Sequence, residues 1–402
     1  MTSAATVGEA LATKSAPGEL DVPLGRHIAA LDGVRGAAIL AVVVYHFGGL
    51  RDAPASWLEK GLLLVTRVGW CGVDLFFVLS GLLITGILLD TREAANRFTS
   101  FYMRRFLRIF PLYYAVLLGY FVVVPWISGR PATGAGEQVW YWTYLCNWST
   151  SFQADTRTPL LSHFWSLAVE EQFYLVWPAL VFFTRRQTLA RLCVAVATVV
   201  LLTRVAMVGL HFPPIAIHRL TVCRIDALAL GGLAAIVLRR PAWLRAVYPR
   251  LRVAAAVLCA LLLAVAVASH GFLEDSAVVE TAGLSLLGLL FAILVVQVVV
   301  ESSGGGGRTA RIFGNPALRW LGKYSYGIYV YNFLLYVAVV EPVSAFAAAQ
   351  TGTLRTVVHL GFLVGGLAAS AAVAVVSWYL LESPLLGLKR LFTADAPSRR
   401  GT

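Results

Sequence analysis

Arg35 and His46 are separated by ten residues in the apolar segment LDGVRGAAILAVVVYHF, residues 31–47. Eleven residues make close to three helical turns, so both side chains fall on nearly one face, roughly 16 Å apart along the axis. A guanidinium and an imidazole on one stripe of a membrane helix are costly, which favours function. The alternatives are an Arg35 that extends to the lipid headgroups and a His46 that is simply interfacial.

A second candidate site lies in LSHFWSLAVEEQFYLVWP, residues 161–178. His163 and Glu170 are seven residues apart and share a helix face at a separation of about 10 Å, with Glu171 about 100° around the helix. Adjacent carboxylates inside an apolar span need a polar cavity or a partner. Glu170 could therefore orient an imidazole or hold a proton. The alternative is an ion pair with one of three arginines: Arg35, Arg204 or Arg224.

A cluster of arginines forms the third candidate, in FYMRRFLRIFPLYY, residues 101–114. Arg104 and Arg108 are four residues apart and share a helix face, and Arg105 lies beside them. Guanidinium groups bind phosphate well, so the cluster is suited to a phosphorylated ligand. A positive-inside membrane anchor is an equally good interpretation from composition alone.

Two shorter segments place further charges within apolar surroundings. GVDLFFVLSGLLIT, residues 72–85, has Asp74 near its start and Gly81 where helices could approach closely. CRIDALALGG, residues 223–232, has Arg224 near its start and Gly231 as a candidate packing residue.

The elements that position these residues are predicted by composition. The chain has 402 residues, of which 58% are hydrophobic and only 13% charged, whereas soluble domains carry about 25% charged residues. We therefore predict an all-α fold, a polytopic membrane helical bundle. Its ten apolar segments are long enough to span a bilayer: 30–49, 69–89, 110–128, 164–183, 192–210, 224–238, 248–269, 280–300, 318–340 and 356–381.

Arginine and lysine are concentrated in alternate connections between these segments, which predicts that both termini are cytoplasmic. The net charge of +12 then reflects basic cytoplasmic loops rather than nucleic-acid binding. We predict a disordered tail over 1–28, a transmembrane domain over 29–390 and a short tail over 391–402. Arginine greatly outnumbers lysine, as in GC-rich bacterial genomes, so we place the chain in a bacterial cytoplasmic membrane.

Several kinds of chemistry lack support. The five cysteines are scattered without metal-ligand spacing, so we expect buried free thiols and no metal site. The chain has no G-x-S-x-G elbow, P-loop, H-E-x-x-H or dinucleotide motif, which argues against a serine triad and against a bound cofactor.

Taken in order, the motifs resemble a known family. The Arg35–His46 helix is followed by GVDLFFVLSGLLIT, FYMRRFLRIFPLYY, FWSLAVEEQFYLVWP, RIDALALGG and WLGKYSYGIYVYN. Together they are similar to the acyltransferase 3 family of integral-membrane O-acyltransferases, over about residues 30–390. The resemblance implies transfer of an acyl group, commonly acetyl from acetyl-CoA, to a hydroxyl of a glycan, a glycolipid or a sugar-bearing antibiotic such as a macrolide. The partners expected are acyl-CoA, this acceptor and the lipid bilayer.

The resemblance also implies roles for individual residues. Arg35 and His46 match the family's essential pair, the arginine cluster its basic motif, and Glu170 and Glu171 its paired carboxylates. Asn332 stands where many members have a histidine near the end of the late motif. We expect further substrate or acyl-CoA contacts from a set of polar residues: Arg104, Arg105, Arg108, His163, Glu171, Asp74, Arg224 and Asn332.

From this chemistry we expect His46 to be the general base, with Glu170 holding or relaying the proton. His163 is the alternative base, and direct transfer and an acyl-histidine intermediate both remain open. Members with a fused esterase domain are longer than this chain, so we expect a small or lipophilic acceptor. A proton-coupled transporter of a sugar or antibiotic is the rival function, because such proteins also carry intramembrane Arg, His and Glu.

Overall fold

The computed structural model describes residues 27–49, 57–152 and 158–395, and these residues form helices and no strands. Nine helical segments in the described part are long and apolar enough to cross a membrane. They are Ala29–Phe47 (α1), Glu59–Asp90 (ending in α3, Gly72–Asp90), Arg97–Ser128 (beginning with α4, Arg97–Leu118), Arg186–Gly209 (α9), Pro214–Leu238 (α10, Pro214–Arg219, and α11, Thr221–Leu238), Pro241–Ala268 (α12), Val279–Ser303 (η6, Val279–Gly283, and α13, Leu284–Ser303), Pro316–Ala348 (α15) and Gly352–Phe392 (α16, Gly352–Ser377, through α17, Ser383–Gly387, and η8, Leu388–Phe392).

The remaining predicted span, residues 164–183, corresponds to helix α8, Trp165–Phe183. It has 19 residues, as α1 has, but is not among the nine apolar segments because Glu170, Glu171 and Gln172 lower its mean hydropathy. The prediction of an all-helical membrane bundle is confirmed. One boundary differs in an informative way. Helix α4 begins at Arg97, so the arginine cluster lies on the helix itself instead of in the connection before it.

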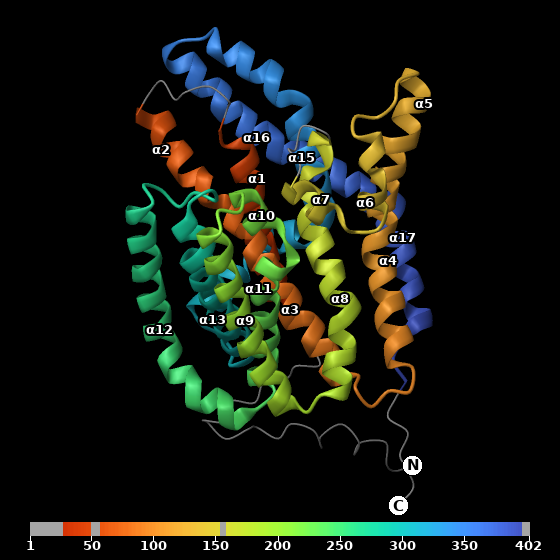
Figure 1. The fold of residues 1–402 in the computed structure, drawn as a ribbon, viewed down its shortest axis with the longest axis vertical. Helices are drawn as coiled ribbons and strands as arrows, with labels where there is room; N and C mark the ends of the chain where they lie inside the picture. The colour runs from red at the N-terminus through yellow and green to blue at the C-terminus, as the bar shows by residue number, and fades with distance from the viewer. Residues whose placement is uncertain (1–26, 50–56, 153–157, 396–402) are drawn as a thin grey trace, which may run out of the picture.

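Helix α1 lies inside the bundle and packs against α15, α3 and α16 (Figure 1). The backbones of α1 and α15 are in direct contact. A Cβ atom at Gly36 would lie 1.8 Å from the Leu318 carbonyl oxygen, and one at Gly322 would lie 1.8 Å from the Asp32 oxygen. Only glycine permits this approach, and it fixes Arg35 and His46 relative to α15.

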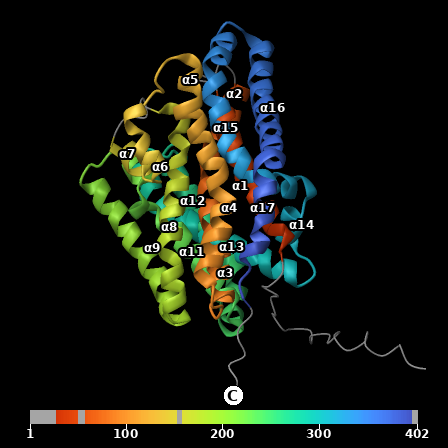
Figure 2. The same cartoon turned by 90° about the vertical axis from the view of Figure 1, so that its right-hand side faces the viewer.

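Helices α3 and α11 approach each other in the same way. A Cβ atom at Gly81 would lie 1.9 Å from the Leu228 oxygen, and one at Gly231 would lie 2.0 Å from the Val78 oxygen. The prediction that these glycines mediate helix packing is confirmed. Helix α4 lies beside the C-terminal helix α17 in both views of the ribbon (Figures 1 and 2).

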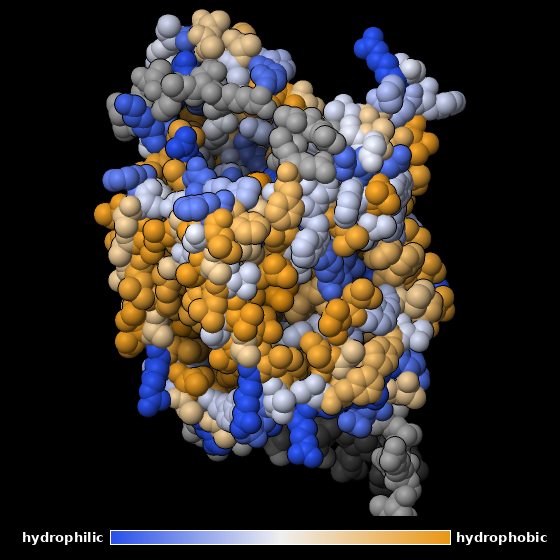
Figure 3. Space-filling view, viewed as in Figure 1, coloured by the Kyte–Doolittle hydropathy of each residue, from blue (hydrophilic) through white to orange (hydrophobic). Residues whose placement is uncertain are grey.

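On the face shown in Figure 3, an apolar belt crosses the middle of the bundle, with hydrophilic groups toward both ends. The first turn of α1 and Lys389 of η8 line one cavity, so both ends of the described chain lie at the same end of the bundle. We call this the arginine end, after Arg35, and the opposite end, where α1 finishes at Phe47, the histidine end. Which end is cytoplasmic stays a prediction. Of the predicted tails 1–28 and 391–402, residues 27–28 and 391–395 are described, and Leu391 and Phe392 belong to η8; the rest of both tails lies outside the described residues.

All five cysteines are free, and Cys146, Cys193 and Cys223 are buried as expected. The expectation is wrong for Cys259, which is exposed. It belongs to α12, whose apolar residues face outward along most of the helix.

Candidate functional site

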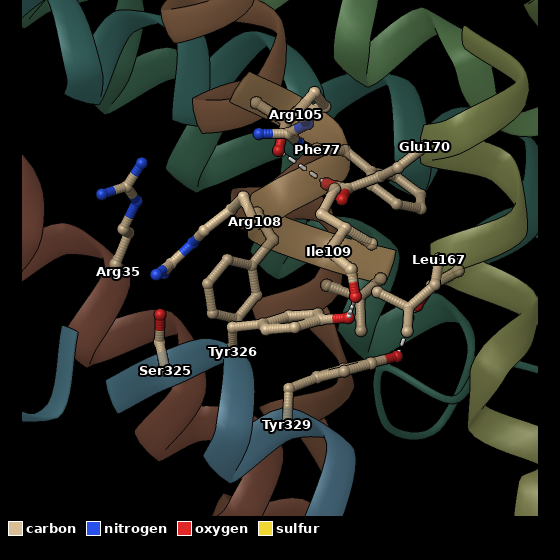
Figure 4. Close-up of a pocket in the computed structure, with 14 residues that line it drawn as sticks. Arg35, Phe77, Arg105, Arg108, Ile109, Leu167, Glu170, Ser325, Tyr326 and Tyr329 are labelled. Carbon is tan, nitrogen blue, oxygen red and sulfur yellow. Dashed lines mark hydrogen bonds between the residues drawn. The ribbon is translucent and has the colours of Figure 1, made fainter. Parts of the chain in front are cut away.

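A central cavity of about 100 Å³ opens between α1, α3, α4, α8 and α15. Arg35, Arg105, Arg108, Glu170 and Tyr329 all line it. Figure 4 shows the guanidinium groups coming from α1 and α4, while Glu170 reaches in from α8 and the tyrosine from α15. Arg105 and Arg108 are three residues apart, so α4 presents both toward α1. The structure therefore brings together the three motifs that the sequence singled out.

A second cavity of about 380 Å³ shares Arg35, Arg105 and Arg108 with the first and continues toward the arginine end. It adds Lys323 and Lys389, so five cationic side chains surround it with one carboxylate, Asp32. A third space of about 250 Å³ beside it is lined by the exposed Arg104. Such an excess of positive charge around a cavity is suited to a ligand with several negative charges.

Aromatic rings hold the two inner arginines without occupying their N–H groups. The Arg105 guanidinium lies 3.9 Å from the centre of the Tyr174 ring, and that of Arg108 lies 5.9 Å from Tyr326 and 5.6 Å from Trp378. Within the described residues, neither arginine has a carboxylate close enough for an ion pair. Cation–π contacts therefore fix the guanidinium planes and leave their hydrogen-bond donors available to a ligand.

The two adjacent glutamates point into different spaces. Glu170 accepts a 2.6 Å hydrogen bond from the Ser80 hydroxyl at the central cavity. Glu171 faces a separate, largely apolar groove between α4 and α8, lined also by Phe106 and Leu175. A hydrophilic patch interrupts the apolar belt between these two helices in Figure 3. Adjacent positions on a helix are about 100° apart, which explains the divergence.

The alternative of an ion pair between Glu170 and Arg35, Arg204 or Arg224 is wrong for the described geometry. Arg204 donates to Asp226 at 2.8 Å, and Arg224 donates to Asp74 at 2.8 Å. Asp74 and Arg224 are both buried and line neither arginine-lined cavity. Their contact joins α3 to α11, which gives them a role in packing; a substrate contact from either stays a prediction.

His46 is held by Asn332 of α15. Its Nδ1 lies 2.5 Å from the Asn332 Oδ1 atom. The Asn332 amide nitrogen donates to the carbonyl oxygens of Ile328 and Tyr329, which fixes the orientation of the amide. Since an amide oxygen only accepts, Nδ1 must carry the proton. This arrangement leaves Nε2 of a neutral His46 with its lone pair free to accept a proton.

His163 lies at the same end, just before α8 in η5, Pro159–Phe164. Its Nε2 lies 3.1 Å from the Val330 carbonyl oxygen and therefore donates to it, and its Nδ1 is buried without a partner. The rings of His46 and His163 both contact Phe333, with centroids 4.8 and 5.0 Å away. The two candidate bases therefore lie around one aromatic ring.

Glu170 does not contact His46, contrary to the expected proton relay. Helix α8 begins at the histidine end with His163 preceding it, and seven residues carry Glu170 about 10 Å toward the arginine end. Its hydrogen-bond partner there is Ser80. Asn332 occupies the position beside His46 that we expected Glu170 to fill.

Tyr329 and Ser166 connect the two ends. Both line the central cavity, and their hydroxyl oxygens lie 2.5 Å apart. The Tyr329 hydroxyl also donates to the His163 carbonyl oxygen at 3.0 Å. The cavity that begins among the arginines thus ends at residues that touch His163.

Sequence reasoning did not single out Tyr329, Ser166, Lys323 or Lys389. The first three lie inside motifs used for the resemblance, WLGKYSYGIYVYN and FWSLAVEEQFYLVWP, so closer attention to their polar residues could have found them. Lys389 lies in none of these motifs, and only the fold brings the C-terminal segment to the cavity.

Comparison with known proteins identifies the family of this chain. A family model described as an acyltransferase domain matches residues 28–382. A peptidoglycan O-acetyltransferase of Listeria monocytogenes is 30% identical over 90% of this chain and 56% of its own length. A putative peptidoglycan O-acetyltransferase of Bacillus subtilis is 30% identical over 77% of this chain and 48% of its own length. This chain thus spans about half the length of the curated relatives it matches. No solved structure matches it.

Proposed function

The chain belongs to this acyltransferase family, and on that premise we propose that it is a membrane O-acyltransferase. It moves an acetyl or other short acyl group from acyl-CoA to a hydroxyl of a carbohydrate or a sugar-bearing molecule. The observation that carries the proposal is the cationic cavity at the arginine end, which adjoins the central cavity through shared arginines; the central cavity is also lined by Tyr329, which donates to His163.

The donor binds at the arginine end. Coenzyme A carries several phosphate charges, and Arg35, Arg105, Arg108, Lys323 and Lys389 surround a cavity that suits them. If this end is cytoplasmic, it faces the compartment that contains acyl-CoA. Guanidinium groups held on aromatic faces are ready for phosphate with little loss of side-chain freedom.

The pantetheine arm then extends into the central cavity. Its walls include Val73, Phe76 and Leu167, which suit an uncharged chain, and its far end has the hydroxyls of Ser166 and Tyr329. The thioester thereby approaches the histidine end while the phosphates stay among the arginines.

His46 is the general base. A sugar hydroxyl is too weakly acidic to attack a thioester unaided, so a base must take its proton. The hydroxyl oxygen bonds to the acyl carbonyl carbon, its proton passes to Nε2 of His46, and the carbon–sulfur bond breaks. The leaving coenzyme A thiolate takes up a proton to become the thiol. His163, whose Nδ1 is unpartnered, is the second candidate for the same role.

The acceptor is a carbohydrate hydroxyl at the histidine end. Support comes from the relatives, two of which are named for peptidoglycan O-acetylation. A glycan, a glycolipid and a macrolide glycoside all offer such a hydroxyl, and the location we propose is the bacterial cytoplasmic membrane.

The test uses the purified full chain in lipid nanodiscs with acetyl-CoA labelled in the acetyl group. Peptidoglycan fragments, a glycolipid and a macrolide are supplied in parallel, and labelled products are identified by mass spectrometry. We expect an O-acetylated product with at least one acceptor and none with His46→Gln. Acetyl transfer that continues unchanged in His46→Gln and His163→Gln would contradict the proposed base, and no transfer to any hydroxyl would contradict the function.

A further inference from the structure

Four polar residues form a chain beside His46 that the proposed mechanism does not use. Tyr45 lies in the last turn of α1, His218 belongs to α10, Glu274 lies in the connection after α12, and Glu280 belongs to η6. We call them the outer polar chain. They come from four separate elements, so only the fold brings them together.

The four residues of the outer polar chain follow one another from a buried end to an exposed end. Glu280 is buried and its Oε1 lies 2.7 Å from Nδ1 of His218. Nε2 of His218 faces Oε2 of Glu274 at 3.8 Å. The Tyr45 hydroxyl donates to the other oxygen of Glu274 at 2.9 Å. The Glu274 side chain is 43% exposed, so this end of the chain is accessible.

The polar atoms of His218 and Glu274 face each other across a gap that no described side chain fills. A carboxylate only accepts, so Nδ1 of His218 must donate to Glu280, and Nε2 of the neutral ring presents a lone pair. In the neutral ring, Nε2 and the Glu274 oxygen are two acceptors that lie 3.8 Å apart, which is too far for a direct hydrogen bond. Glu280 Oε2 is buried without a partner, and at the other end of the outer polar chain Tyr45 donates to Glu274. A ligand with adjacent O–H donors satisfies both acceptors at once.

We propose that the outer polar chain binds hydroxyl groups of the acceptor carbohydrate, with His218 and Glu274 as its hydrogen-bond acceptors. The inference rests on the proposed function, because the bound sugar would be the acyl acceptor. The site lies at the histidine end, because Tyr45, which donates to Glu274, precedes His46 in α1 and the two rings lie 5.4 Å apart. A metal is a poor alternative, since no described group of His, Cys, Asp and Glu could hold one.

Glu274→Gln is the sharpest variant. The glutamine oxygen can still accept from Tyr45, but its NH₂ group replaces an acceptor with a donor and can close the gap to His218. We expect the acceptor KM to rise about tenfold or more, with the KM for acetyl-CoA unchanged. Tyr45→Phe should act in the same direction by a smaller factor. Asp275→Asn is the matched control, because Asp275 is exposed in the same connection.

The experiment measures acceptor and donor KM in nanodiscs for these variants, together with their melting temperatures and the binding of a soluble peptidoglycan glycan fragment. A selective rise in acceptor KM in Glu274→Gln, absent in Asp275→Asn, supports the site. If Glu274→Gln lowers only the melting temperature, the outer polar chain serves only the stability of the fold, and the inference is overturned. If the wild type transfers acetyl to no hydroxyl, the proposed function fails. Fragment binding then decides the site separately: weaker binding in Glu274→Gln supports it, and unchanged binding overturns it.

Discussion

The two ends of the bundle differ in how their polar side chains are held. At the arginine end, five cationic side chains surround a cavity of about 380 Å³ and two guanidinium groups rest on aromatic rings. At the histidine end, His46 is fixed by Asn332, which is itself fixed by two backbone carbonyls. The first arrangement suits a large anion, whereas the second selects one tautomer of one ring. Binding and chemistry are therefore separated along α1.

The largest expected effect is at the histidine end. His46→Gln removes the proposed base, so we expect kcat to fall by about 10²–10⁴-fold, while coenzyme A still binds at the far end. The initial rate of labelled acetyl transfer measures this. His270→Asn is the control, because His270 is exposed at the same end and asparagine tolerates its positive φ of 52°. A normal rate in His46→Gln would contradict the assignment of catalysis to the histidine end.

A smaller effect, on KM instead of kcat, is expected at the arginine end. Arg108→Gln removes charge-assisted hydrogen bonds to the donor phosphates, so the KM for acetyl-CoA should rise about 10–100-fold. The wild-type KM should also rise with salt, because added ions screen these contacts. Arg245→Gln is the control, since Arg245 is exposed and lines none of the arginine-lined cavities. An unchanged donor KM in Arg108→Gln would place coenzyme A elsewhere.

Asn332 sharpens the comparison, because its role is to position His46. Asn332→Leu removes the acceptor that selects the Nδ1–H tautomer, and we expect kcat to fall about tenfold. Asn332→Asp keeps an oxygen facing Nδ1 and should recover much of the rate. The donor KM should stay the same in both variants. A similar loss in both would show that Asn332 matters only for packing.

The smallest effect is expected from the glutamate outside the central cavity. Glu171 faces the groove between α4 and α8 and is partly exposed, so Glu171→Gln should change kcat/KM about fivefold or less. Glu170→Gln, inside the cavity with three arginines, should have the larger effect. The reverse order of the two effects in the same transfer assay would contradict the assignment of separate spaces.

The local patterns predicted much of the fold and of the arginine end. Length and hydropathy predicted each spanning helix. Spacing along one helix placed Arg35 and His46 on nearly one face, and placed Arg105 beside Arg104 and Arg108. Such relations depend on 3.6-residue periodicity, which a sequence displays directly.

The histidine end was less predictable, because its contacts join distant segments. His46 and Asn332 are 286 positions apart, and Tyr45 and Glu274 are 229 apart. The glycines of α1 and α15 bring the first pair together, and no periodicity encodes that approach. The helical period placed Glu170 by its depth along α8, but the side chain in contact with His46 comes from α15. A role for Glu170 in proton transfer stays a prediction.

The most direct test of this separation is calorimetric binding of unreactive coenzyme A to the wild type, His46→Gln and Arg108→Gln in nanodiscs. No chemistry occurs, so the dissociation constant reports the donor site alone. The account predicts an unchanged Kd for His46→Gln and a Kd raised about tenfold or more for Arg108→Gln. Weakened binding in His46→Gln together with an unchanged Kd in Arg108→Gln would contradict it.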